Sequence, residues 1–440
     1  MTALLCLAGS LIVFGPLLGS LNGPLGGGDL FSVYVTTTSI NPFGLSVTQH
    51  FGYPDGMDLR YFPGLDVVPG LVAQIVNALT GSAFLGVNLV LMLSGSATGV
   101  VAYLTLRLVR LSGPIAISLA TAFALIPFHW DRGLGHVYLA TMTSAALAVA
   151  LALLIGGGWM PGVLSRDPQR GLRIAMLVVA IVVVAWSGIY FACFALLIGV
   201  AAWIWRVSHG DHRRDLLAAG VPIVGVAGLV VLGLLPALVQ QRLHPPATPI
   251  ADRLASESAT YAGNILMALL PAPLDGVPGT SGYREWAESL FAAIPANEAT
   301  GLGNFGTWVT TACLVLYGIG GIVMYRRSRA RHQSRPCVTW SLVATLIVVT
   351  TAFFIPWGAN MLVASTVSAQ IRAWNRLLPI LLLLFVVGAG LVLAQARWTR
   401  QPIIAGAIAG AILLSASISS VLPYRDLYAG TARNAAALAE

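Results

Sequence analysis

Long apolar runs recur along the whole chain, separated by short polar segments. A bilayer core of roughly 30 Å needs an apolar helix of about 18 or more residues, and runs such as Leu172 to Val207 and Leu377 to Ala394 carry almost no charge. The pattern predicts about eleven membrane helices: Thr2–Leu21, Ala83–Leu106, Pro114–Phe128, Val137–Ile155, Leu172–Trp186, Tyr190–Trp205, Leu217–Val239, Gly306–Tyr325, Val338–Trp357, Trp374–Ala394 and Ile403–Val421. The apolar stretch Val67–Leu79 is shorter, and we expect it to lie at the interface or to re-enter.

Composition agrees with this pattern. Of the 440 residues, 57% are hydrophobic and only 9% are charged, which leaves too little polar surface for a soluble protein of this size. The first apolar run lacks a basic segment before it and a convincing cleavage site, so we expect it to be a retained helix. The predicted fold is therefore an all-α polytopic membrane protein.

The distribution of charge predicts the topology. All 24 basic residues are arginines, and most fall in alternate short loops if the amino terminus lies inside, as the positive-inside rule requires. The other side is net acidic and carries two long loops, residues 22–82 and 240–305. We therefore expect a multi-pass protein of the cytoplasmic membrane, with a transmembrane domain over residues 1–421, a short extracytoplasmic tail at 422–440 and chemistry in the outer loops.

The first outer loop begins with Gly26-Gly27-Gly28-Asp29. A carboxylate at this place can act as a general base on an acceptor hydroxyl, or hold a divalent cation such as Mg²⁺ or Mn²⁺ against a phosphate leaving group. The alternative is an ordinary solvated aspartate. His50, beside the Pro54-Asp55-Gly56 turn, is a further candidate for contact with a ligand.

The second outer loop places several ionisable groups between two apolar helices, in the segment His129-Trp130-Asp131-Arg132-Gly133-Leu134-Gly135-His136. Such groups at the end of a membrane helix are costly unless they are paired or functional. We therefore expect Asp131, Arg132 and His136 to bind substrate, and Asp29, Asp131 and His136 are the candidates for a metal ion. A structural salt bridge between Asp131 and Arg132 is the alternative.

Arginines near the tenth predicted helix suit an anionic ligand. Arg372 and Arg376 are four residues apart, which would place them on one face of a helix, and guanidinium groups bind phosphate oxygens in pairs without losing their charge. The alternative is that they extend to lipid headgroups. In the large loop, Arg253, Glu257 and Tyr261 follow a helical spacing and Glu298 precedes the eighth helix; Arg253, Tyr261 and Glu298 are further binding candidates.

The order of these features resembles the GT-C superfamily of membrane glycosyltransferases, especially its bacterial YfhO-like branch. The shared features are Gly28-Asp29 after a first span, the Pro54-Asp55-Gly56 turn, the short loop Arg132 to His136, a large outer loop ending at Glu298 to Gly303, and the late motif Arg372 to Arg376. The resemblance covers nearly the whole chain. Relatives often carry an acidic pair at the first aspartate, whereas Gly28 and Leu30 flank Asp29.

The resemblance implies an enzyme that moves a hexose or pentose from a polyprenyl-phosphate donor to an extracytoplasmic acceptor, which is a cell-wall glycan, lipid or protein. Asp29 would be the catalytic carboxylate, and Arg372 and Arg376 would hold the departing lipid phosphate. A transporter or flippase of a lipid-linked glycan is the main alternative, and a non-catalytic assembly protein is another. The sequence contains no phosphate-binding loop of the Walker type and no nucleophile elbow.

Overall fold

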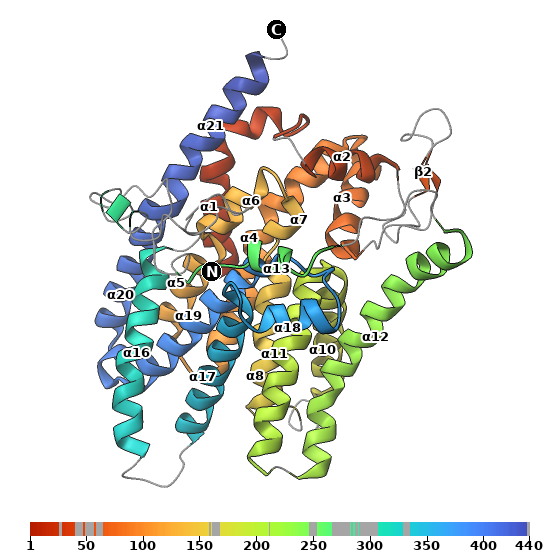
Figure 1. Cartoon of the computed structure of the whole chain (residues 1–440). Helices are drawn as coiled ribbons and strands as arrows, with labels where there is room; N and C mark the ends of the chain where they lie inside the picture. The colour runs from red at the N-terminus through yellow and green to blue at the C-terminus, as the bar shows by residue number, and fades with distance from the viewer. Residues whose placement is uncertain are drawn as a thin grey trace.

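Helices make up most of the regular structure in the computed structural model (Figure 1). The structure describes residues 1–25, 29–39, 47–48, 57–58, 65–157, 160, 168–210, 212–245, 253–265, 282, 285–286, 289, 307–328 and 335–437. The elements before residue 210 are α1 Thr2–Phe14, η1 Gly15–Ser20, α2 Asp29–Ser39, β1 Val47–Thr48, β2 Met57–Asp58, α3 Val67–Thr80, α4 Ala83–Leu108, α5 Gly113–Ala124, α6 Pro127–Gly133, α7 Val137–Ala140, α8 Thr143–Gly156, α10 Arg170–Trp186 and α11 Ile189–Ser208. Those after it are α12 Arg213–Leu243, α13 Glu257–Thr260, α16 Trp308–Ser328, α17 Arg335–Phe354, α18 Ala359–Thr366, η3 Trp374–Leu377, α19 Leu378–Gln395, η4 Arg397–Arg400, α20 Pro402–Ala416, η5 Ser417–Val421 and α21 Leu422–Ala437.

Every predicted membrane helix coincides with helical structure. Seven helices in the described part of the chain are long and apolar enough to cross a membrane, or up to eight if a bent pair counts as one span. The all-α polytopic membrane fold is therefore confirmed, while the number of about eleven spans stays a prediction. The two strands pair antiparallel within the first long loop, with Val47 opposite Asp58 and Thr48 opposite Met57.

The bent pair consists of residues 339–354 of α17 together with α18, and its two parts meet at an angle of 59°. Gly358 lies at the break, where an added Cβ would collide with the carbonyl oxygen of Ala352. Only glycine fits such a close approach of two backbone segments. The bend turns the chain toward the segment that contains Arg372 and Arg376.

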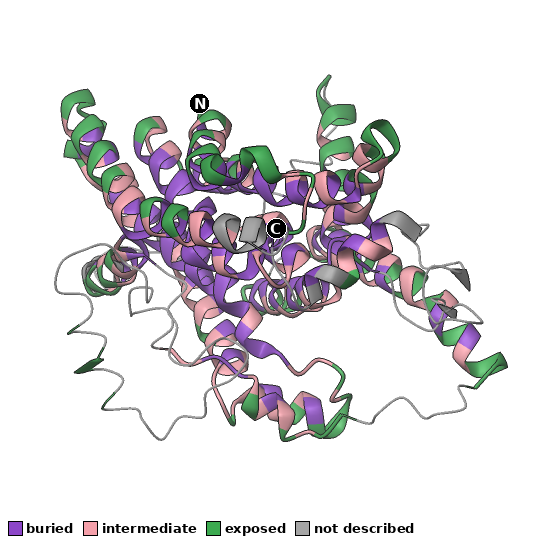
Figure 2. Cartoon of the chain, turned by 90° about the horizontal axis from the view of Figure 1, so that it is seen from above, coloured by how far each residue is buried: buried purple, intermediate pink, exposed green. Residues whose placement is uncertain are grey.

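Helix α19 forms the centre of the core. It is apolar on all sides, and nearly all of its residues are buried, as expected for a helix that other helices surround. Its neighbours include α4, α5, α8, α16 and α17. In Figure 2, buried residues fill the interior and exposed ones lie on the outer faces. Exposed Leu217, Val224 and Val231 give α12 an apolar outer face suited to lipid.

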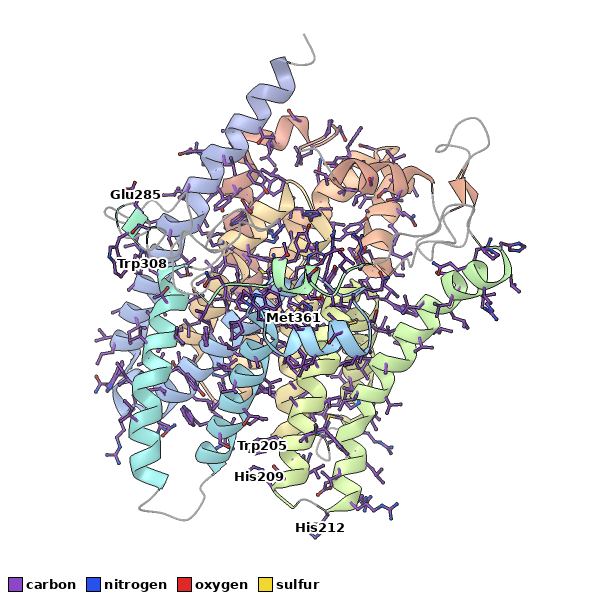
Figure 3. The ribbon with its side chains drawn as sticks, viewed as in Figure 1. Trp205, His209, His212, Glu285, Trp308 and Met361 are labelled. Atoms are coloured by element: carbon purple, nitrogen blue, oxygen red, sulfur yellow. The ribbon has the colours of Figure 1, made fainter. Side chains whose placement is uncertain are left out.

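The two ends of the helical bundle differ in character. The connection from α11 to α12 lies at one end, together with the lower ends of α16 and α17, whereas α2, α3, α6 and α7 gather at the other (Figure 1). Figure 3 places His209 and His212 at the first end, far from Glu285 and Trp308. Arg206, Arg213 and Arg214 flank the two histidines, so a basic connection lies opposite the end that carries the long loops.

The segment expected to be a carboxyl-terminal tail is helical. A π-helical turn, η5, joins α20 to α21, and α21 continues to Ala437. Tyr424 and Tyr428 are buried one turn apart, and the ring of Tyr428 packs edge-on against Phe14 and Trp130. This apolar stripe explains why the helix continues past residue 421, where the last predicted span ends.

A buried polar network fastens the start of the first long loop to α4. The Tyr34 hydroxyl donates to Asn88 Oδ1 at 2.7 Å and accepts from the backbone N–H of Leu25 at 3.2 Å. The Asn88 amide also donates to the carbonyl oxygens of Leu21 at 2.9 Å and Gly23 at 3.1 Å. Burial raises the pKa of Tyr34 to about 12, so it remains a neutral donor. The network thereby fixes the two segments on either side of the Gly26 to Gly28 run.

Replacing Asn88 by leucine should destabilise this region, because leucine keeps the volume but removes the acceptor of the Tyr34 hydroxyl proton and the donor to the carbonyls of Leu21 and Gly23. Each unsatisfied buried group costs about 1–3 kcal/mol. We expect a lower thermal midpoint in detergent, measured by the fluorescence of a thiol dye or by light scattering. The exposed change Thr80→Val is the control, and an unchanged midpoint in Asn88→Leu would show that the network contributes little.

Candidate active site

The first predicted site residue, Asp29, begins α2. Its side chain lies outside the described part of the structure, as do His50 and Glu298. The backbone position is nevertheless informative, because α2 is tied to α4 through Tyr34 and Asn88. A residue at the first position of this helix is therefore held at the same end of the molecule as α3, α6 and α7 (Figure 1).

The late arginines come from an irregular segment between α18 and α19. Helix η3 begins at Trp374, so Arg372 precedes it and Arg376 lies within it. The prediction that both lie on one face of a regular helix is wrong, because residues 371–373 are not helical and a 3₁₀-helix turns more tightly than an α-helix. The two guanidinium groups consequently have different partners.

Arg372 is paired with a residue of the long segment between α12 and α16. Its guanidinium donates to Glu257 Oε2 at 2.7 Å and lies 4.5 Å from the centre of the Tyr261 ring. Arg253 contacts the same carboxylate at 3.8 Å, although it lies before α13, which begins at Glu257. The hydrogen bond from Arg372 is the main reason that the pKa of Glu257 is lowered.

Backbone contacts extend this attachment. The N–H of Asn375 donates to the Tyr261 carbonyl at 3.1 Å, and that of Gly263 donates to the Phe354 carbonyl at 2.7 Å. The Asn360 side chain, which is buried, donates to the Ser258 carbonyl at 3.2 Å. Residues 253–263, which we call the α13 segment, therefore pack against both α18 and the late arginines. Figure 3 shows Met361 of α18 at the level where α13 lies in Figure 1.

Replacing Glu257 by glutamine should loosen the α13 segment. The change removes the charge that binds Arg372 and Arg253 but retains the shape, and partly exposed ion pairs have modest energies. We expect trypsin to cleave after the exposed Arg253 about two to five times faster than in the wild type, measured by mass spectrometry of protein in nanodiscs.

The matched control for this experiment is Glu285→Gln, which changes an exposed residue of the same large loop. Equal cleavage in Glu257→Gln and Glu285→Gln would show that the ion pair does not hold the segment.

Arg376 faces a different group of residues. Its guanidinium lies 4.1 Å from the centre of the Tyr190 ring, in the first turn of α11, an arrangement that favours a cation. Asp66, the residue before α3, lies close enough for its charge to interact with that of Arg376. Asp66 is an exposed residue, but desolvation by nearby protein raises the pKa of its carboxyl to about 6, against the lowering effect of Arg376.

Further groups converge on the same carboxylate. Tyr138 of α7 interacts with Asp66 and shares a hydrogen bond with the Thr37 side chain. Gly188, between α10 and α11, has φ 136°, and a Cβ there would lie 3.3 Å from Asp66 Oδ1. A glycine at this position lets the carboxylate approach the start of α11.

The predicted residues of the second outer loop lie in and after α6. Arg132 is buried and lies 6.0 Å from the centre of the Phe128 ring. Asp131 is half-buried and its charge interacts with that of Arg132, whereas His136 precedes the first residue of α7. His129, to which the sequence analysis assigned no role, is completely buried and its Nδ1 lies 2.9 Å from the Ala140 carbonyl.

The metal candidates can be tested only in part. Within the described residues, no three His, Cys, Asp or Glu side chains come together to hold a metal ion. Asp131 and His136 therefore do not form such a group with described neighbours, and the side chain of Asp29 is not described. A Mg²⁺ or Mn²⁺ requirement stays a prediction, and no chemical step below depends on it.

Asp66, Tyr138 and Tyr190 were not singled out by the sequence analysis. Asp66 is one of several acidic residues in a long loop, and only the fold brings it to Arg376. The sequence around Gly188 could have indicated this region, because two long apolar runs meet at Ser187-Gly188 and a tyrosine follows at position 190. A break between two apolar helices indicates a place where backbone and aromatic groups face a polar partner.

Comparison with known proteins gives a distant structural likeness. No protein-family model matches the sequence, and no curated protein matches it. Solved structures of the Archaeoglobus fulgidus oligosaccharyltransferase match 97–98% of this chain at 14–15% identity, with TM-scores of 0.44 for the apo form, 0.44 for the complex with Zn and sulfate, and 0.45 for AglB with an inhibitory peptide and a dolichol-phosphate.

The chain covers 53–56% of the length of those structures, which is slightly more than half. Nothing in the comparison distinguishes the YfhO-like branch. At these TM-scores, no residue role and no activity is transferred to this chain.

Proposed function

We propose that this protein transfers a sugar from a polyprenyl-phosphate donor to an extracytoplasmic acceptor, which is a cell-wall glycan, lipid or protein. The observation that carries the proposal is the position of Arg376. It lies in η3, two residues before α19, the most apolar helix of the core, and its guanidinium is held over Tyr190 beside the end of the bundle that carries the long loops. A fixed cation at the junction of apolar and polar regions suits a lipid phosphate.

The proposed reaction is a displacement at the anomeric carbon. Asp29 accepts the proton of the acceptor hydroxyl while the acceptor oxygen forms a bond to that carbon. The bond between the carbon and the phosphate oxygen breaks, and the polyprenyl phosphate leaves with the electron pair. Arg376 stabilises the charge that develops on this phosphate, whereas Arg372, already paired with Glu257, contributes mainly by holding the α13 segment beside it.

The orientation of the site follows from the charge of the connections. Arg206, Arg213 and Arg214 lie at the opposite end of the bundle from α2, α6 and α7. If the basic end faces the cytoplasm, the long loops and Arg376 face outward, and the acceptor meets the donor on the extracytoplasmic side of the cytoplasmic membrane.

The test is a transfer assay with the purified full chain in liposomes. A set of radiolabelled polyprenyl-phosphate sugars, hexoses and pentoses, is offered together with membrane acceptors, with and without EDTA and added Mg²⁺ or Mn²⁺. Label that appears in the acceptor fraction only when the protein is present supports the proposal. Label that crosses the bilayer and stays on the lipid would instead identify a flippase.

A further inference from the structure

The arginines at the basic end of the bundle fall into two groups that differ in their counterions. The segments that connect α8 to α10 and α11 to α12, with the first turns that follow, contain aspartates among their arginines: Asp167, Asp211 and Asp215. The segments around the ends of α4, α16 and α19 contain arginines alone: Arg107, Arg110, Arg326, Arg327, Arg329, Arg331, Arg335, Arg397 and Arg400. Residues 67–130 and 299–425 of the sequence include neither aspartate nor glutamate. The second group therefore has no carboxylate in its own part of the chain.

The fold brings the described members of this second group together. The loop between α4 and α5 packs against α19, since a Cβ at Gly390 would lie 3.5 Å from Leu111 and 3.6 Å from Val109. Helix η4 follows α19 and carries Arg397 and Arg400, and α20, which comes next, packs against α5 (Figure 1). Two pairs of arginines, one before α5 and one before α20, therefore lie at the same end of neighbouring helices.

These arginines lie at the surface and have no carboxylate partner. Arg107, Arg110, Arg397 and Arg400 are all exposed, and within the described residues none of them forms an ion pair. Arg107 donates one hydrogen bond, to the Leu111 carbonyl, which leaves most of its five N–H donors for other acceptors. Positive charges gathered on one surface repel each other unless anions lie close by. Anions from outside the protein would remove this repulsion.

The backbone at Arg110 is unusual. This residue follows the end of α4 with φ 63°, a left-handed conformation that glycine adopts readily and that arginine rarely takes. Glycine is the residue most often found in this conformation after a helix. A side chain that contributes binding accounts for an arginine at a place where glycine would fit the backbone better.

Apolar side chains lie directly beside these charges. Trp398 of η4 is 48% exposed, and Ile403, the second residue of α20, is 86% exposed. Exposed tryptophan at the end of a membrane helix is typical of the level at which acyl chains meet headgroups. An acidic protein segment would match the arginines alone, whereas a phospholipid matches both the charges and the apolar groups.

We propose that the surface formed by Arg107, Arg110, Arg397, Trp398 and Arg400, which we call the α4–α20 patch, binds the phosphate headgroups of anionic phospholipids. Guanidinium groups bind phosphate oxygens in pairs and keep their charge at physiological pH. If the basic end faces the cytoplasm, these lipids belong to the inner leaflet. Helix α19 connects η4 to η3, so bound lipid also fixes the depth of this core helix in the bilayer.

Native mass spectrometry of the full chain in detergent tests the proposal without an assay of sugar transfer. The protein is titrated with phosphatidylglycerol or with phosphatidylcholine of the same acyl chains, and a Kd is measured for each lipid. An arginine at a membrane surface contributes roughly a fivefold preference for anionic lipid. We expect phosphatidylglycerol to bind about tenfold more tightly than phosphatidylcholine, and the preference to decrease with added salt. Equal affinity for the two lipids would contradict the proposal.

A pair of double variants distinguishes the patch from the net charge of the protein. Arg397→Gln with Arg400→Gln should remove nearly all of the roughly tenfold preference for phosphatidylglycerol. The matched control is Arg213→Gln with Arg214→Gln, which removes the same charge from exposed positions at the same end of the bundle. This control should keep the wild-type preference. Equal losses in the two double variants would show that only net charge matters and would overturn the α4–α20 patch.

The variant Arg110→Gly removes one guanidinium without straining the fold. Glycine takes a positive φ freely, so the thermal midpoint of the lipid-free protein should not fall. The preference for phosphatidylglycerol should decrease about three- to fivefold. A lower midpoint together with an unchanged preference would show that Arg110 acts in folding and would remove it from the patch.

Competition identifies the source of the anion. Inorganic pyrophosphate and a peptide of ten glutamates are added to the complex of the wild type with phosphatidylglycerol, each at the molar concentration of the lipid. We expect the lipid to remain bound in both cases. Displacement by pyrophosphate would assign the patch to a soluble phosphate, and displacement by the peptide would assign it to an acidic protein. Either result would overturn the proposal of a lipid site.

Discussion

Replacing Asp29 by asparagine is expected to lower the rate of sugar transfer by about 10²–10⁴-fold, the usual contribution of a general base. Asparagine has nearly the same shape as aspartate but cannot accept the proton of the acceptor hydroxyl at neutral pH. Since the substitution leaves Arg376 and Tyr190 in place, donor binding should change little. The loss should therefore appear in kcat rather than in the KM for the donor, measured with radiolabelled donor at matched expression.

Asp426→Asn is the matched control, because it removes a carboxylate from an exposed position outside the proposed site. It should transfer sugar at the wild-type rate. Equal turnover in Asp29→Asn and the wild type would remove Asp29 from the mechanism. In that case the carboxylates to examine next are Asp66, beside Arg376, and Asp131, in α6.

The helices were predictable because their signal is local. A membrane helix needs a long uninterrupted apolar segment, and each of the predicted segments coincides with helical structure. The positions at which helices bend or end were less predictable from the sequence. The bend between α17 and α18 depends on the approach of Gly358 to the Ala352 carbonyl, and α21 continues because Tyr424 and Tyr428 pack against residues from distant helices.

The candidate site was predictable only in its separate parts. The sequence indicates that Arg372 and Arg376 suit an anion, but their spacing alone suggested equivalent roles. The fold separates them, because η3 begins after Arg372 and the α13 segment supplies Glu257 to one arginine only. Asp66 and Gly188 are more than 100 residues apart in the chain, and no local pattern relates two such positions before the fold is known.

The different surroundings of the two arginines predict different effects of their replacement. Arg376→Met should raise the KM for the donor and lower kcat, for a combined loss of about 10²-fold or more in kcat/KM. It removes charge-assisted hydrogen bonds of about 1.5–3 kcal/mol each, and these bonds strengthen as the departing phosphate gains charge. Arg372→Met should cost much less, since that guanidinium already binds Glu257.

The substitution Arg376→Lys distinguishes the effect of the positive charge from the effect of the planar guanidinium group. Lysine retains the positive charge but lacks the planar group that lies over Tyr190 and binds two oxygens at once, so we expect an intermediate loss. Steady-state kinetics with one donor at several concentrations distinguishes the three variants. Equal losses in Arg372→Met and Arg376→Met would mean that the ion pair opens during catalysis and that both arginines bind the phosphate.

The Arg376→Met protein should nevertheless fold, because Asp66 can take up a proton when the positive charge of Arg376 is removed. Removing Arg376 takes away the positive charge that lowers the pKa of Asp66, and a partly desolvated carboxylate without a nearby cation is costly to keep charged. However, the pKa of Asp66 is already about 6, and the loss of Arg376 raises it further, so the group can avoid the cost by taking up a proton. We therefore expect a nearly normal thermal midpoint at pH 6 and a lower one at pH 8, where neutralising Asp66 is harder. A midpoint that falls equally at both pH values would show that Arg376 supports the fold through packing and not through its charge.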